Sequence, residues 1–250
     1  MDAPRPPIPR QRLCFGDWPA AVYAVGDVHG CYDALAEIER QILADGAEIP
    51  GEKWIVMLGD YVDRGPRSRD VIDRLIEPLP DGFRRICLVG NHELLMLGFL
   101  DDPDLHAYWL DQGGVDTLAS YGVEAHSEEA QAVPANLLAP MQRNIPPAHV
   151  DFLRTLPIML ELPGWLFVHA GVRPGVPLDR QSDEDLVWIR EPFLSKGLAA
   201  YRVVHGHTPE SEPQVTPYRI GIDTHCYETG RLTALRLTED GEPRFFTAQT

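Results

Sequence analysis

The chain has 250 residues, of which 44% are hydrophobic and 24% charged, as in a globular protein long enough to bury a sizeable core. Lys and Arg number 22 against 38 Asp and Glu, and the net charge of −16 argues against binding to duplex nucleic acid. A small anionic substrate fits this charge only if something strongly positive, such as a bound metal, lies in its site.

The sequence also argues against a secreted or membrane protein. Residues 1–12 carry proline and charge but no apolar signal-peptide segment, and no apolar run approaches the roughly 18 residues of a membrane span. The four cysteines lack the paired spacing of a zinc ribbon. We therefore expect a cytoplasmic protein with free thiols and no membrane partner.

Residues 1–18 are rich in proline and arginine, which predicts a flexible N-terminal arm before a single domain at 19–250. The domain begins with three units of strand, loop and helix. Apolar runs predict the strands and helical spacing predicts the helices, at 21–25 and 32–43, 54–58 and 68–79, and 85–89 and 94–100. This alternation predicts an α/β fold with a parallel, buried sheet covered by helices.

The pattern changes at residues 101–157, where helical fragments are broken by proline and glycine. We interpret this segment as a helical cap inserted into the domain. Strands resume at 158–162 and 165–168, and the Pro-Gly between them predicts a hairpin that enters a second sheet. Four more strands are predicted at 201–204, 219–222, 232–237 and 244–247.

Polar clusters follow the three early strands and recur later, as GDVHG at 26–30, GDYVDRG at 59–65, GNHE at 90–93, HAG at 169–171 and HGHT at 205–208. An ordinary turn explains any one cluster, but not five in this order. Sites in open α/β sheets form outside the carboxyl ends of the strands. The clusters supply carboxylate, amide and imidazole groups, which are ligands for divalent metals, at Asp27, His29, Asp60, Asn91, His169 and His207.

The ordered set resembles the metallophosphoesterase superfamily. GDYVDRG with GNHE is similar to its phosphoprotein phosphatase branch, particularly to bacterial serine/threonine phosphatases and symmetrical diadenosine tetraphosphate hydrolases. The resemblance covers roughly residues 22–237 and is loose in the cap. It implies an αββα sandwich of two mixed sheets flanked by helices, with a centre of two divalent metals. Manganese is expected, with iron, zinc, cobalt or nickel as alternatives.

The resemblance also implies a role for each residue. Asp27, His29 and a bridging Asp60 would hold the first metal, and Asp60 with Asn91, His169 and His207 the second. His92 would be the general acid, oriented by Asp63. Arg64 and Asn91 would bind the substrate phosphate, together with Arg190, which lies in a stretch, VWIREP, that resembles a second phosphate-binding segment.

These roles describe hydrolysis at phosphorus. A hydroxide that bridges two metals attacks, arginines and metals hold the phosphoryl charge, and the acid protonates the leaving group. We expect a phosphatase acting on phosphoserine or phosphothreonine, and also on phosphotyrosine. The alternative substrate is a dinucleoside polyphosphate, such as diadenosine tetraphosphate, or a nucleotide-capped RNA end. A noncatalytic scaffold is a third hypothesis, although no expected ligand is missing.

Several residues keep two interpretations. His205 alternates with His207 along a strand and is a competing metal ligand, although the resemblance favours His207. His225 stands where similar sequences predict glycine, and it either lines the substrate pocket or is a tolerated change. Cys31 and Cys226 adjoin the clusters and are either sites of oxidative inactivation or inert buried thiols.

Overall fold

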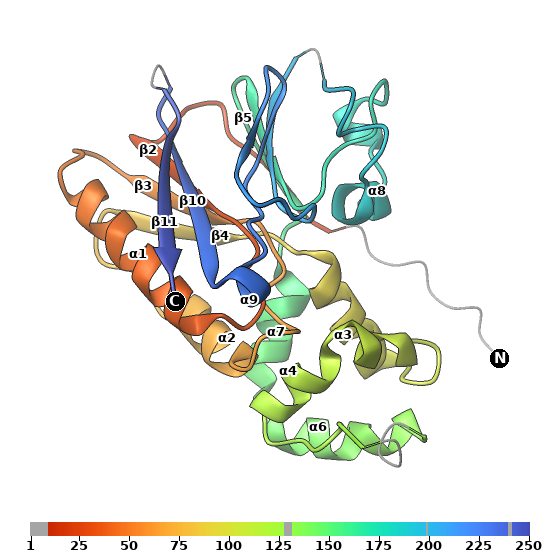
Figure 1. Cartoon of the computed structure of the whole chain (residues 1–250). Helices are drawn as coiled ribbons and strands as arrows, with labels where there is room; N and C mark the ends of the chain where they lie inside the picture. Colours follow the sequence, from red (N-terminus) through yellow and green to blue (C-terminus); the bar gives the residue numbers. More distant parts are fainter. Residues whose placement is uncertain (1–9, 128–131, 199, 240–241) are drawn as a thin grey trace.

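The computed structural model describes residues 10–127, 132–198, 200–239 and 242–250 of the chain. Two mixed sheets lie face to face, with helices outside both (Figure 1). This is the αββα sandwich that the sequence predicts. In the described residues, no helix is both long enough and apolar enough to cross a membrane.

The first sheet has the order β11-β10-β2-β3-β4. Its centre is parallel, with Ala24 of β2 opposite Val56 of β3 and Ile86 of β4 opposite the same residue. The strands β10 and β11 come from the end of the chain, and β10 is antiparallel to β2 while β11 is antiparallel to β10. The bounds are β2 Ala21–Val25, β3 Lys53–Met57, β4 Phe83–Cys87, β10 Arg231–Leu237 and β11 Arg244–Gln249.

The second sheet has the order β1-β5-β6-β7-β9-β8. The hairpin predicted around Pro163 and Gly164 is present as antiparallel β5 and β6. The bounds are β1 Arg12–Cys14, β5 Met159–Leu162, β6 Trp165–Val168, β7 Arg202–His205, β8 Gln214–Val215 and β9 Arg219–Gly221.

Alternation along the strands divides the core into layers. Val22 and Ala24 of β2 pack between the sheets with Phe167 and Val204 of the second sheet. Tyr23, on the opposite face of β2, packs under the helices. The helices outside the first sheet are α1 (Tyr32–Ala47) and α2 (Ser68–Ile76), and α8 (Asp183–Trp188) lies outside the second (Figure 1).

The segment predicted as a cap is helical and gathers beyond one end of the sheets (Figure 1). It follows α3 (Asn91–Asp101), which starts three residues earlier than the sequence predicts, so that the GNHE cluster forms the first turn of a helix. In the described part of the chain the remaining helices are η1 (Ala107–Gln112), α4 (Gly114–Ser120), η2 (Pro134–Leu137), α6 (Leu138–Asn144), α7 (Pro147–Thr155), η3 (Leu178–Arg180) and α9 (Cys226–Thr229).

The predicted N-terminal arm differs from the structure. Arg12–Cys14 forms β1, which pairs in parallel with β5, and residues 1–9 of the predicted arm lie outside the described residues. The Arg12 guanidinium holds the strand in place, because it donates to the Leu178 and Gln181 carbonyls and pairs with Asp183. Because these partners are distant in sequence, composition could not reveal the strand and predicted a flexible arm in its place.

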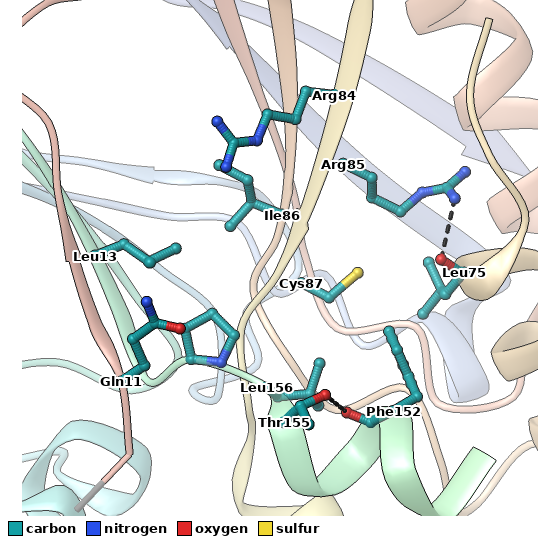
Figure 2. A pocket seen from close by; sticks show the side chains of 11 residues that line it. Gln11, Leu13, Leu75, Arg84, Arg85, Ile86, Cys87, Phe152, Thr155 and Leu156 are labelled. Atoms are coloured by element: carbon teal, nitrogen blue, oxygen red, sulfur yellow. Dashed lines mark hydrogen bonds between the residues drawn. The ribbon is translucent and has the colours of Figure 1, made fainter. Parts of the chain in front are cut away.

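The edge strands β1 and β4 border a cavity of about 340 Å³, which Figure 2 shows. Leu13 comes from β1, Ile86 and Cys87 come from β4, and Phe152 from α7 closes the lower side. None of the predicted metal ligands lines it. This cavity is therefore a separate feature from the polar clusters.

Candidate metal centre

The structure brings all five polar clusters to one end of the two sheets. Four of the clusters line a cavity of about 190 Å³, and HAG lies behind it. Eight of the ten predicted site residues line it, namely Asp27, His29, Asp60, Arg64, Asn91, His92, Arg190 and His207. The other two lie directly behind: Asp63 accepts from His92 Nδ1, and His169 Nε2 lies 2.8 Å from Asn91 Oδ1.

The loops that carry these residues have an unusual backbone. Among the described residues, the non-glycine residues with positive φ all lie in or beside the site, at His29 (43°), Asp60 (52°), Asp63 (73°), Arg64 (68°), His207 (62°) and His225 (61°). Such a conformation costs on the order of 1–3 kcal/mol per residue and persists only where surrounding contacts impose it. The clustering therefore points to a function for these loops.

Asp60 is at the centre of the arrangement. Its Oδ2 lies 3.5 Å from His29 Nε2 and 3.4 Å from His169 Nε2. The ligand atoms of His29, Asp60 and His92 lie within 4.8 Å of one another, as do those of Asp60, His169 and His207. Asp60 belongs to both groups, which is the position of a carboxylate that bridges two ions.

The ring orientation of two histidines suits a metal. His29 Nδ1 donates to the Val62 carbonyl at 2.8 Å, and His169 Nδ1 donates to the Leu58 carbonyl at 2.9 Å. In both rings Nε2 then carries the lone pair and faces Asp60. Burial lowers the pKa of His29 to about 3 and also lowers the pKa of His169, so both rings are neutral and able to bind a cation.

The second group is completed by an amide oxygen. Asn91 Oδ1 lies 2.8 Å from His169 Nε2 and 3.0 Å from His207 Nδ1. His207 also donates its backbone N–H to Asp27 Oδ2 at 3.0 Å, which joins the HGHT and GDVHG clusters. Burial lowers the pKa of His207 to about 3.

The residues present fit a pair of bound cations. Asp27 Oδ1 is buried and has no hydrogen-bond partner among the described residues. Burial, followed by the charges of Asp223 and Asp60, raises the pKa of Asp27 well above its usual value. Several acidic groups thus share a buried site, and a divalent cation would compensate their charge. Oxygen and imidazole donors without thiolate are suited to manganese, iron, cobalt, nickel or zinc.

Glu93 supports the centre and was missed from the sequence. Its Oε2 accepts the N–H groups of Asp60 and Gly90 at 2.9 and 2.8 Å, and its Oε1 accepts that of Tyr61 at 2.7 Å. Burial and the charge of Asp60 raise the pKa of Glu93 to about 7. Glu93 therefore ties the loop after β3 to the start of α3, a role that only the tertiary structure reveals.

His92 and Asp63 form the predicted pair. His92 Nδ1 lies 2.7 Å from Asp63 Oδ2, and His92 Nε2 faces the cavity, 3.9 Å from Asp60 Oδ2. Burial lowers the pKa of His92, but the carboxylates of Asp60 and Asp63 outweigh it and raise the pKa above the usual value. This ring is thus the one in the site that is best placed to carry a proton.

The two predicted phosphate-binding arginines both line the cavity. Arg64 donates to the Tyr227 hydroxyl at 2.6 Å, and its guanidinium lies 4.7 Å from the centre of the Tyr227 ring. Arg64 Nη2 lies 3.2 Å from His92 Nε2. Arg190 makes one long contact to the His207 carbonyl at 3.5 Å. Tyr227 was not predicted, although it lies in the same short segment as His225.

The structure bears on three open interpretations. His205 donates from Nδ1 to the Gly206 carbonyl and accepts at Nε2 from Arg219, so both ring nitrogens are used away from Asp60. His225 lines the cavity, and its Nε2 lies 2.6 Å from the Tyr227 hydroxyl. Cys31 and Cys226 are both free thiols, and Cys226 is buried.

The chain is similar to known proteins in sequence and in fold. The chain matches the family model of the calcineurin-like phosphoesterases over residues 20–244. It is 27% identical to the asymmetrical bis(5'-nucleosyl)-tetraphosphatase PrpE of Oceanobacillus iheyensis, over 86% of this chain and 88% of the relative. The corresponding protein of Geobacillus sp. strain WCH70 is 23% identical, over 86% of this chain and 89% of the relative.

Solved structures show the same fold. A putative diadenosine tetraphosphatase superposes with a TM-score of 0.69 at 23% identity, covering 96% of this chain and 98% of the other. A serine/threonine phosphatase from Saccharomyces cerevisiae superposes with a TM-score of 0.55 at 13% identity, covering 96% and 84%.

Proposed function

Because the chain belongs to the calcineurin-like phosphoesterase family and is a metal-dependent phosphoric ester hydrolase, we propose that its substrates are dinucleoside tetraphosphates. The observation that carries the substrate class is the name shared by the curated relatives, which match over most of their length. The sequence resemblance pointed to symmetrical hydrolases, whereas these relatives are named asymmetrical. We therefore propose asymmetrical cleavage.

In this proposal Asp27, His29 and Asp60 would hold one divalent metal, and Asp60, Asn91, His169 and His207 would hold the other, with manganese as the proposed ion. Two such cations would act as Lewis acids and lower the pKa of a nearby water. Arg64, Arg190 and the Asn91 amide bind the phosphate oxygens of the substrate. His92 delivers a proton from Nε2 to the leaving oxygen, while its Nδ1–H stays on Asp63.

The cavities leave room for a long substrate. A second, more open cavity of about 420 Å³ adjoins the metal centre and shares Arg64, Gln112 and Tyr227 with it. A polyphosphate at the metals would pass Arg64 and place a nucleoside in this cavity. Trp188 also lines the metal centre and is 42% exposed, so it offers an aromatic surface for a base.

A phosphoprotein substrate is the second candidate. GDYVDRG with GNHE favours it, and the metal ligands, His92 and the arginines would act on any phosphoryl group. The two candidates differ only in what lies beyond the phosphate.

The test compares two substrates, diadenosine tetraphosphate and a phosphothreonine peptide, on the Mn²⁺-loaded enzyme, with chromatography of the products. We expect the nucleotide to be cleaved faster and to give ATP and AMP. Two ADP molecules would indicate symmetrical cleavage, and faster peptide turnover would support the second candidate. His92→Asn should lower the rate by about 10²–10⁴-fold. Full activity in excess chelator would overturn the metal-dependent chemistry.

A further inference from the structure

The cap contributes two side chains to the acid pair. Trp109 of η1 donates from Nε1 to both carboxylate oxygens of Asp63, at 3.1 and 2.9 Å. Thr117 of α4 donates from Oγ1 to Asp63 Oδ1 at 2.7 Å. Asp63, Trp109 and Thr117 are all fully buried. The carboxylate is therefore held on one side by the cap and on the other by His92.

Thr117 also holds the backbone of Asp63. Its Oγ1 accepts the Asp63 N–H at 2.7 Å while its hydroxyl hydrogen goes to the carboxylate. One hydroxyl thus fixes both ends of the residue. This matters because Asp63 has a φ of 73°, a conformation that needs outside contacts to persist.

The turn that carries Asp63 and Arg64 also packs against the cap. Arg64 donates its N–H to the Gly113 carbonyl at 3.3 Å, at the junction of η1 and α4. Gly113 has a φ of 101°, and a Cβ there would lie 2.5 Å from Arg64 N. The junction therefore packs directly on the turn that carries both Asp63 and Arg64, with no room for a side chain at Gly113.

We propose that Trp109 and Thr117 are positioning residues for proton donation by His92. They hold the Asp63 carboxylate in the orientation that takes the Nδ1–H of His92, and this keeps His92 Nε2 facing the cavity. Loss of either donor frees the carboxylate to rotate, and the imidazole follows it. The inference rests on the proposed role of His92 as the general acid, but on neither candidate substrate.

The test uses two aryl phosphates that differ only in the leaving group. Phenyl phosphate needs a proton on its poor leaving group, whereas p-nitrophenyl phosphate needs little help. Thr117→Val and Trp109→Phe should lower kcat for phenyl phosphate by about tenfold or more, which is a part of the full general-acid effect. The same variants should lower kcat for p-nitrophenyl phosphate by less than about threefold. Thr117→Ser, which retains the hydroxyl, should restore both rates.

Tyr121→Phe is the matched control. Tyr121 is a buried hydroxyl residue at the end of α4, but it bonds to His149 at 2.8 Å and not to Asp63. This variant should leave both rates unchanged. In the Asp63→Asn background, Thr117→Val should cause no further loss, because the group that it positions is already gone.

A second readout does not depend on activity. In the Zn²⁺-loaded protein, the low-field proton resonance of the His92–Asp63 hydrogen bond should shift or vanish in Thr117→Val and Trp109→Phe, and persist in Tyr121→Phe. An unchanged resonance, or an equal loss of rate on both esters, would overturn the inference. If the esters follow the expected pattern but diadenosine tetraphosphate is not cleaved, the proposed substrate fails and the positioning role stands.

Discussion

At the scale of single residues, the hydrogen bonds of the two ring nitrogens distinguish the predicted metal-ligand histidines from a packing histidine. His29 and His169 each use Nδ1 on a backbone carbonyl and leave Nε2 for the centre. His205 uses both nitrogens on Gly206 and Arg219. His207, two residues later, has Nδ1 3.0 Å from Asn91 Oδ1, and its Nε2 is buried with no hydrogen-bond partner among the described residues. The two neighbouring histidines therefore differ, although the sequence pattern alone did not exclude His205.

This contrast gives a direct prediction for the metal content. Loss of a residue that only supports a metal ligand weakens metal binding by up to about a hundredfold. Because His207 is a proposed ligand itself, His207→Ala should weaken metal binding at the second proposed position by more than that. His205→Ala should keep both ions, because it removes only contacts away from the centre: the hydrogen bonds to Gly206 and Arg219, and packing against Phe193, whose ring centre lies 5.1 Å away. Elemental analysis of the purified variants measures the ratio of metal to protein. Equal metal loss in both variants would contradict the assignment.

The site was predictable where residue type and strand order carried the information. Asp27, Asp60 and Asn91 follow successive strands, and the parallel sheet brings them together. Glu93 was not predictable, because its partners are backbone N–H groups on two separate loops. Trp109 and Thr117 had no signal either, since they reach Asp63 from the cap, where the family resemblance is loose.

At the scale of elements, segments with a clear apolar pattern were predicted well, whereas the strands β1 and β8 were not predicted. β2 and the beginning of α1 match the predicted positions because their apolar spacing is regular. β1 and β8 have only three and two residues, too few to show a period. β1 exists because β5 offers it an edge and Arg12 finds distant partners.

One ion-pair cluster joins several elements of the first layer. Asp45 of α1 accepts from the Tyr23 hydroxyl of β2 at 2.6 Å, from Arg236 of β10 at 2.8 Å and from Arg244 of β11 at 2.7 Å. Burial raises the pKa of Asp45, but the Tyr23 hydroxyl and Arg236 outweigh it and hold the pKa below its usual range. The ionised carboxylate therefore fastens α1 to the sheet.

Asp45→Asn should lower the free energy of unfolding at pH 7 by about 1–3 kcal/mol, the usual contribution of hydrogen bonds to a charged group. Because the folded pKa is depressed, this stabilisation is fully present above the unfolded pKa of about 3.9 and is lost as the pH falls through the folded value. The difference in free energy of unfolding between wild type and Asp45→Asn should thus stay constant from pH 7 to 5 and become smaller below about pH 4.

Urea unfolding at several pH values measures this gap. Glu37→Gln is a suitable control, because Glu37 lies on the same helix and pairs only with its neighbours Arg40 and Gln41 on the exposed face. It should change stability little at any pH. A gap for Asp45→Asn that widens on acidification would contradict the predicted direction.

At the scale of the whole molecule, the proposed ligands come from both layers of the sandwich. Asp27, Asp60 and Asn91 follow strands of the first sheet, whereas His169 and His207 follow strands of the second. The layers otherwise meet through apolar side chains such as Val56 and Phe167. Metal binding would therefore cross-link the two sheets at the end where the cap also packs.

This arrangement predicts that metals stabilise the entire fold and not only the site. A ligand that binds only the folded state and is present at a concentration of 100 times its Kd adds about 2.7 kcal/mol to the free energy of unfolding. A domain of this size gains about 2–4 °C in Tm for each kcal/mol. Mn²⁺ should therefore raise the Tm of chelator-treated protein by about 5–10 °C. Asp60→Asn, which removes the bridging charge, should lose most of this shift, whereas Asp45→Asn should start from a lower Tm and keep the shift. Calorimetry measures the shift, and a main transition that Mn²⁺ leaves unmoved would contradict binding of the metal to the folded state.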